Sequence, residues 1–389
     1  MKFFNREKEI KEVLSVIESE PQLIYFIYGP INSGKTALIK EVIRKLDLDK
    51  YIPFYIDFRM KNIVDIDDFA EILLEVRDDI EVKTLEESIE RALEIILSNI
   101  KLLKGASIFF GMPINIPISE KVFQKFLDGI SKKEKKVGNI YTYIEKLLLR
   151  IRSLGKVPIL ILDELQMLKD ISLNGNRTLL KSFFQFLVGL TKAHHLAHVF
   201  CISSDSLFIE HVYSNAELEN RADYILVDDF EKKEALKFID FLTKEILKEK
   251  IFLNSKEKEK IYELIGGKPV LLVKVINKLK TKPLDEVLSY LLQDEKAKIK
   301  MELEKFDYVK VKVLYENQEV EVKKENVIEV LKKFKDKDVL KKDEVKAPVY
   351  YYLVRKNILF LDPIKEILKP QSRLTWHAIN KALKELNFV

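Results

Sequence analysis

The chain has 389 residues, more than one hydrophobic core usually holds, so its length predicts two or three domains. Hydrophobic residues make up 47% and charged residues 33%, which excludes bulk disorder. The net charge of +5 is too small for this length to indicate a nucleic-acid partner by itself. No apolar run approaches the roughly 20 residues that span a bilayer, and the N-terminus lacks a signal-peptide core.

These features predict a cytoplasmic protein that does not enter a membrane. Lys, Glu and Ile are abundant, whereas the chain has 1 Cys, 5 Met and 1 Trp, a balance that favours a heat-adapted source. The single Cys201 lies inside an apolar run, so we expect it to fill the core in a reducing compartment.

A phosphate-binding loop is predicted after the first apolar run. Leu23 to Tyr28 reads as a buried strand, the pattern Gly-x4-Gly-Lys-Thr follows, and an amphipathic helix begins at Ala37. Glycines let the loop backbone turn its amide groups inward, and the helix adds its positive N-terminal end. The loop residues expected to bind nucleotide are Gly29, Pro30, Ile31, Asn32, Ser33, Gly34, Lys35 and Thr36.

Within this loop two side chains have expected roles. Lys35 should reach the β and γ phosphates of ATP, and the Thr36 hydroxyl should hold Mg²⁺. The alternative is a structural strand, turn and helix without a nucleotide.

A second apolar run, from Lys156 to Leu162, ends in Asp163 and Glu164. Such a run is typical of a central parallel strand whose carboxyl end meets the site. We expect Asp163 to bind Mg²⁺ and Glu164 to orient the water that attacks the γ phosphate. Taken alone, the pattern also fits a strand followed by a solvated acidic turn.

Further strands complete the predicted sheet. Tyr51 to Phe58 alternates, with Pro53 favouring an edge position, and Val199 to Ser203 reads as the fourth strand. Ser203 ends that strand where a γ-phosphate sensor is needed, with Ser204 beside it. A helix cap near Asp205 is the competing interpretation.

The histidines of this region do not predict a metal site. His194 and His198 would share one face of a helix, but no acid or Cys cluster accompanies them in the sequence.

Three segments resemble the archaeal ATPase family, which belongs to the STAND branch of AAA+-like proteins. They are Phe3 to Glu9, the Asp-Glu-x-Gln sequence ending at Gln166, and the Gly-Gly-x-Pro sequence ending at Pro269. The resemblance implies that Arg6 and Pro269 lie near the adenine. It further implies that Arg221, just before a fifth strand, faces bound nucleotide from the same chain or a neighbouring one and helps catalysis.

The C-terminal region reads as three short helices and a β-wing, the elements of a winged helix. The helical patterns cover 326–334, 339–345 and 348–356, and the piece from Tyr350 to Leu359 would be the recognition-type helix that runs into the wing. Basic residues able to meet DNA phosphates are Lys341, Lys342, Lys346, Arg355 and Lys356, but Asp336, Asp338, Asp343 and Glu344 interrupt that field. A DNA partner and a protein partner therefore remain equally open.

The sequence thus predicts an α/β P-loop NTPase core with a five-stranded, mostly parallel sheet, a helical lid and a C-terminal winged-helix domain. The expected domains are 1–228, with an insertion at about 60–150 that contains a hairpin at 105–119, then 229–295 and 296–389. The expected function is Mg²⁺-dependent hydrolysis of ATP to ADP and phosphate by a conformational switch that can oligomerise. The alternative is a DNA-binding regulator or mobile-element accessory protein in which ATP stabilises an assembly with little turnover.

Overall fold

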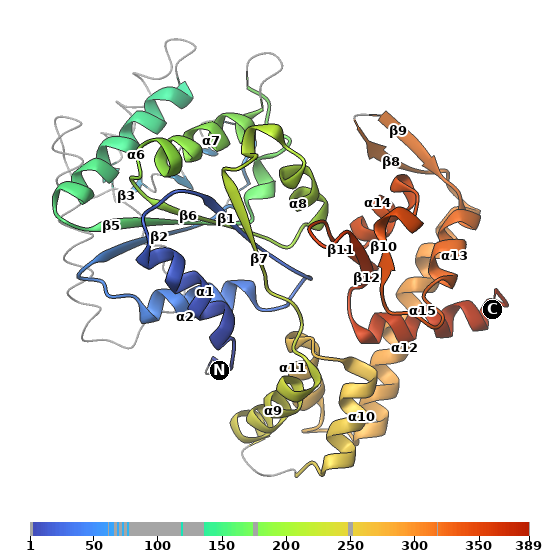
Figure 1. The fold of residues 1–389 in the computed structure, drawn as a ribbon. Helices are drawn as coiled ribbons and strands as arrows, with labels where there is room; N and C mark the ends of the chain where they lie inside the picture. Colours follow the sequence, from blue (N-terminus) through green and yellow to red (C-terminus); the bar gives the residue numbers. More distant parts are fainter. Residues whose placement is uncertain are drawn as a thin grey trace.

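A central sheet, a group of helices and a smaller C-terminal unit make up the protein (Figure 1). The computed structural model describes residues 3–388 except 61, 66–67, 70–71, 74–75, 78–117, 120–135, 174–177, 248–251 and 317. Within these residues, no helix is long and apolar enough to cross a membrane.

The central sheet has five strands, all parallel, in the order β2-β5-β6-β1-β7. This confirms the predicted five-stranded sheet, and Pro53 lies in β2 at its edge. Because all strands run the same way, their carboxyl ends meet at one edge, where Asp163 is in register with Ile202 and Tyr28 with Ser203. The strands are β1 Ile24–Tyr28, β2 Tyr51–Asp57, β5 Val157–Asp163, β6 His198–Ser203 and β7 Ala222–Leu226.

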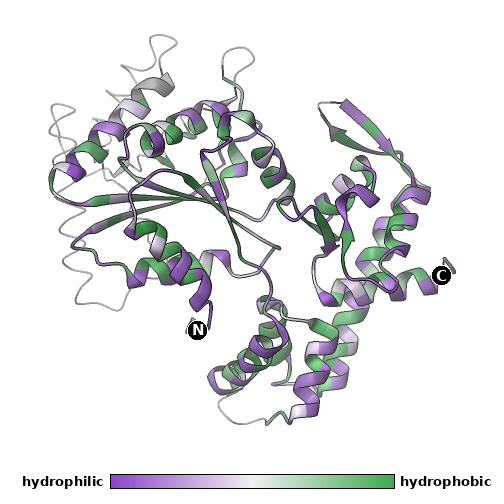
Figure 2. Ribbon diagram, viewed as in Figure 1, coloured by the Kyte–Doolittle hydropathy of each residue, from purple (hydrophilic) through white to green (hydrophobic). Residues whose placement is uncertain are grey.

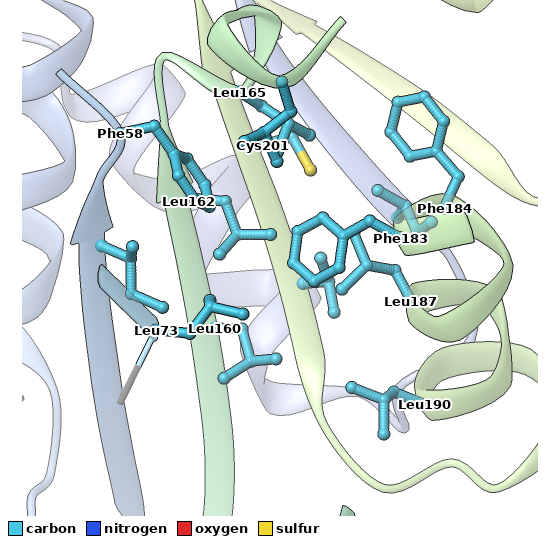
Figure 3. Close-up of a cluster of buried hydrophobic side chains, with 14 of the residues drawn as sticks. Phe58, Leu73, Leu160, Leu162, Leu165, Phe183, Phe184, Leu187, Leu190 and Cys201 are labelled. Atoms are coloured by element: carbon cyan, nitrogen blue, oxygen red, sulfur yellow. The ribbon is translucent and has the colours of Figure 1, made fainter. Parts of the chain in front are cut away.

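Helices cover both faces of this sheet (Figures 1 and 2). Both faces need cover because successive side chains of a strand point to opposite faces and the strands are apolar on both. Ile159 and Ile161 of β5 pack in the cluster that includes α1 and α2, whereas Leu160 and Leu162 pack in the cluster that includes α6, α7 and α8. Figure 3 shows Leu160 and Leu162 on the side of Phe183 of α7. The helices are α1 Glu7–Glu18, α2 Lys35–Lys45, α6 Lys136–Ser153, α7 Leu179–Val188 and α8 Ser206–Tyr213.

Cys201 of β6 lies fully buried in the second of these clusters, as predicted (Figure 3). Burial raises the pKa of its thiol, so the side chain stays neutral. The hairpin predicted at 105–119 lies outside the described residues, apart from β4 Ile118–Ser119, which pairs in parallel with β3 Val76–Arg77.

The helical group after the core has its own apolar cluster. Gly266, with φ of 74°, ends one helix and Pro269 opens the next. Asn254 caps the start of one of these helices by accepting from Glu257 N. The helices are α9 Lys232–Leu242, α10 Ser255–Ile265, α11 Pro269–Lys278 and α12 Leu284–Glu304, which continues into the C-terminal unit.

The C-terminal unit contains a three-stranded sheet of order β10-β12-β11 packed with helices. Its chain order, with the antiparallel hairpin β11-β12 directly after α14, is that of a winged helix. The elements are β8 Val311–Tyr315, β9 Gln318–Val322, α13 Lys324–Lys332, β10 Leu340–Lys341, α14 Ala347–Arg355, β11 Leu359–Asp362, β12 Ile367–Pro370 and α15 Arg373–Glu385.

The helix predicted at 339–345 was wrong. Leu340 is buried and pairs with Leu368 in the sheet, and only the 3-10 helix Lys342–Glu344 follows. Seven residues are too few for a stable isolated helix, so the strand pairing decides the conformation. The hairpin β8-β9 and the helix α15 were not predicted.

We predict that the change His198→Gln will flatten the pH dependence of stability. Burial, with Arg152 nearby, lowers the pKa of His198 to about 4. The unfolded chain takes up its proton at about 6.5, so lowering the pH through this window favours unfolding. The wild type should lose about 2 kcal/mol more than the variant between pH 7 and pH 5.

Urea denaturation at both pH values measures this difference. His194→Gln, which changes an exposed histidine, is the matched control. An equal loss in wild type and His198→Gln would contradict the prediction.

Candidate nucleotide site

The loop after β1 has the backbone that the sequence predicted for phosphate binding. Gly29 has φ of 153°, and a Cβ there would lie 2.2 Å from the Val227 carbonyl oxygen, so only glycine fits. Asn32 and Gly34 also have positive φ, at 60° and 102°, and α2 begins at Lys35. The loop therefore curls directly into a helix N-terminus, where amide groups and the helix field favour an anion.

Lys35 is buried inside this loop. Its ammonium donates to the carbonyl oxygens of Gly29 at 3.0 Å and Pro30 at 2.9 Å. Burial lowers the pKa of Lys35 to about 8, and the positive charge of Lys268 adds to this effect. Phosphate oxygens would be stronger partners for this ammonium than the two carbonyls.

Asp163 reaches the loop from the carboxyl end of β5, although β6 lies between β5 and β1. The side chains nevertheless meet, because both strands end at the same edge of the sheet. Asp163 Oδ2 accepts from the Thr36 hydroxyl at 3.0 Å and from the Tyr55 hydroxyl at 2.5 Å. Burial raises the pKa of Asp163, while these two bonds act in the opposite direction.

Asp163 Oδ1 is buried and has no hydrogen-bond partner among the described residues. A buried, unpartnered carboxylate oxygen beside a hydroxyl fits a divalent cation, because Mg²⁺ prefers oxygen ligands. No group of three or more His, Cys, Asp and Glu residues within the described ranges could hold a metal ion. His194 and His198 do not share a helix face, because His194 follows a π-helix and His198 lies in β6.

Glu164 follows with a left-handed backbone, φ 60° and ψ 40°. Its carboxylate accepts from Gln166 Nε2 at 2.5 Å and lies 3.3 Å from the Arg59 guanidinium. Burial raises the pKa of Glu164, and Arg59 opposes that shift. The left-handed turn, rare for a glutamate, places the acid at the same edge as Asp163.

The predicted sensor position is linked to this acid through Gln166. Ser203 donates to Gln166 Oε1 at 2.8 Å, and Ser204 lies 3.5 Å from Glu164 Oε1. Asp205 caps α8 by accepting from Leu207 N and Phe208 N, so the helix-cap interpretation is confirmed. Both serines therefore lie beside the acid.

Arg6 and Lys268 hold the outside of the loop. The buried guanidinium of Arg6 donates to Ser33 O at 2.9 Å and Asp228 O at 2.5 Å, and it lies over the Phe230 ring. Lys268, directly before Pro269, donates to Ile31 O at 3.0 Å. The N-terminal segment and the helical group thus both contact the loop.

Residues 3–275 match a family described as an ATPase domain predominantly from Archaea. The chain belongs to this archaeal ATPase family. Residues 285–383 match a second family, described as the C-terminal domain of MJ1010-like uncharacterized ATP-binding proteins.

Similar proteins align with nearly the whole length of this archaeal ATPase. Two relatives from Methanocaldococcus jannaschii, each named an uncharacterized ATP-binding protein, are 53% and 49% identical to it. Their alignments cover 98% of this chain and 100% and 98% of the relatives. A Walker-type ATPase of Pyrococcus abyssi has a similar fold, with a TM-score of 0.56 and 17% identity over 97% of this chain and 96% of that one.

Arg221 does not join the site of its own chain in this archaeal ATPase. Its carbonyl accepts from Ile24 N, at the first residue of β1, and its guanidinium donates to Glu217 O. The loop follows the other end of β1, about 13 Å away at the usual rise per residue. The expectation that Arg221 faces nucleotide bound in its own chain is therefore wrong, because Arg221 lies beside the start of β1 and the loop lies after β1, at the opposite edge of the sheet.

Tyr55, Arg59 and Gln371 belong to the site but were not predicted to. Tyr55 and Arg59 lie at the carboxyl end of β2, and Asp57 pairs in register with Asp163. Because parallel strands end at one edge of a sheet, the end of β2 could have been predicted to lie beside the acids at the end of β5. No such signal exists for Gln371, which accepts from Ile31 N at 3.4 Å from 340 residues away.

We predict that Gly267→Ala will lower the free energy of unfolding. A Cβ at Gly267 would lie 1.7 Å from the Phe230 carbonyl oxygen, so the turn before α11 and the segment at Phe230 must move apart. Such overpacking costs about 1–3 kcal/mol. Gly189→Ala is the matched control, because a Cβ there meets nothing within 4 Å.

Urea denaturation of both variants measures the difference. Equal stability of Gly267→Ala and Gly189→Ala would contradict the contact.

Proposed function

We propose that this archaeal ATPase binds ATP with Mg²⁺ in the Gly29–Thr36 loop and hydrolyses it to ADP and phosphate. The observation that carries the proposal is the buried ammonium of Lys35, which donates to two carbonyls of a loop otherwise shaped for an anion. The names of the relatives support ATP as the nucleotide. Arg6 and Pro269 are placed near the adenine end in this proposal.

The Thr36 hydroxyl and the Asp163 carboxylate would hold Mg²⁺. Support comes from the 3.0 Å bond between them and from the unpartnered Oδ1 of Asp163. When bound, the ion neutralises charge on the β and γ phosphates. Tyr55 keeps the Asp163 carboxylate in place through its hydroxyl.

Glu164 would orient the water that attacks the γ phosphate. Its carboxylate lies at the same sheet edge as Asp163, and its raised pKa makes it a better proton acceptor once ionised. Gln166 and Arg59 fix its orientation, and Ser203 fixes Gln166. Through Ser203 and Gln166, β6 is linked to the carboxylate that would orient the attacking water.

ATP binding would act as a conformational switch. Lys268 of the helical group and Gln371 of the C-terminal unit both contact Ile31 of the loop. A nucleotide that changes the loop therefore changes the contacts of both units, and the energy of those contacts biases their positions.

The rival function is a DNA-binding regulator with little turnover. Against DNA contact by α14 in this arrangement, Tyr350 bonds Glu210 of α8 at 2.9 Å and Lys342 lies 2.6 Å from the same carboxylate. This favours a contact within the protein for the surface of α14 that was predicted to face DNA.

The change Glu164→Gln tests the catalytic role. The amide keeps the size of the side chain but cannot accept the proton of water, so the steady-state rate of phosphate release should fall by about 100-fold or more. ATP affinity, measured by calorimetry, should stay within about threefold of wild type, because the loop is unchanged.

The control is Glu145→Gln, which changes an exposed carboxylate on α6. If the wild type releases no phosphate, with or without duplex DNA, hydrolysis is refuted and the rival is favoured.

A further inference from the structure

A cavity of about 340 Å³ lies between the nucleotide loop and the C-terminal unit. One wall carries the catalytic edge of the core, and the other wall comes from α14 and the turns around the β11-β12 hairpin. The core residues that line it include Asn32, Arg59, Glu164, Gln166 and Ser204. The C-terminal residues are Val354, Arg355, Asn357 and Gln371.

The cavity lies at the γ-phosphate end of the proposed nucleotide. Glu164 and Ser204 line it, whereas Arg6, Lys268 and Pro269, proposed for the adenine end, do not. The C-terminal wall therefore faces the place where ATP and ADP differ.

The loop side of the C-terminal wall is held by hydrogen bonds. Gln371 accepts from Ile31 N at 3.4 Å and donates to Leu359 O at 3.1 Å. Directly before the loop, the Tyr28 hydroxyl donates to Asp362 at 2.9 Å. These contacts fix the β11-β12 hairpin relative to the phosphate loop.

The same C-terminal wall is also bonded to α8, the helix that follows β6. Leu361 N donates to the Ser206 hydroxyl at 3.4 Å, and Tyr350 of α14 donates to Glu210 at 2.9 Å. Because both partners lie on α8, the start of α14 has a defined position against the core. Arg355, in the last turn of α14, is thereby placed at the cavity.

Arg355 is exposed and forms no ion pair with the described part of the chain. Among the residues that the structure describes, no carboxylate lies within 4.0 Å of its guanidinium, whereas the next residue, Lys356, lies 3.7 Å from Glu302. A planar guanidinium donates two parallel hydrogen bonds to a phosphate. Asn357 and Gln371 add amide groups to the same wall.

We propose that Arg355 contacts the γ phosphate of ATP bound in the same chain, so that the C-terminal unit supplies the arginine that Arg221 does not. This rests on the proposed function. ADP has no γ phosphate, so its complex lacks the contact, and the C-terminal unit distinguishes the two nucleotides. The guanidinium would also stabilise negative charge that develops as the γ phosphate is transferred.

The affinities for ATPγS and ADP, each with Mg²⁺, test the proposal by calorimetry on the full chain. Arg355→Ala should weaken ATPγS binding about tenfold or more and leave ADP binding within about twofold, because one charged hydrogen-bonding contact is removed. Arg355→Lys should recover part of the loss. Lys356→Ala, which removes the same charge one residue away, should change neither affinity.

Several results would overturn the proposal. If Arg355→Ala lowers the affinities for ATPγS and ADP equally, Arg355 has a structural role. If its ATPγS affinity is unchanged, Arg355 does not contact the γ phosphate. A γ-specific loss in Arg221→Ala with none in Arg355→Ala would assign the arginine to a neighbouring chain. If the wild type binds neither nucleotide, the proposed function itself fails; in the other cases it stands.

Discussion

The site depends on one buried charge, the ammonium of Lys35. It lies buried in a loop whose backbone turns left-handed at Asn32 and Gly34 and leaves no room for a Cβ at Gly29. Burial of a cation is costly unless strong acceptors surround it, and the carbonyls of Gly29 and Pro30 serve here as neutral ones. A polyphosphate would be a better partner, so its binding is coupled to the shape of the loop.

The parallel sheet explains how distant residues meet at this charge. With every strand ending at one edge, Thr36, Tyr55 and Asp163 form one hydrogen-bonded group although they come from α2, β2 and β5. Gln166 and Ser203 form a second hydrogen-bonded group with Glu164 at the same edge. The loop is in turn held from outside by Arg6, Lys268 and Gln371, so three distant parts of the chain contact one loop.

Much of this could be predicted from the sequence, because the informative patterns are local. The loop, its flanking strand and helix, and the acids after a buried strand each occupy a short segment. Sheet polarity could have excluded Arg221 from the site of its own chain, because this residue precedes its strand whereas the loop follows one. The contacts of Gln371 and Asp362 with the core could not be predicted, since they join segments more than 300 residues apart and have no periodic signal.

The most direct test of the central claim is a crystal structure of the Glu164→Gln variant with Mg²⁺ and ATP. The account predicts the β and γ phosphates inside the loop, with the Lys35 ammonium moved from the Gly29 and Pro30 carbonyls onto phosphate oxygens. Mg²⁺ should contact the Thr36 hydroxyl and the Asp163 carboxylate. Nucleotide bound elsewhere, or Lys35 still bonded to both carbonyls with ATP present, would contradict the account.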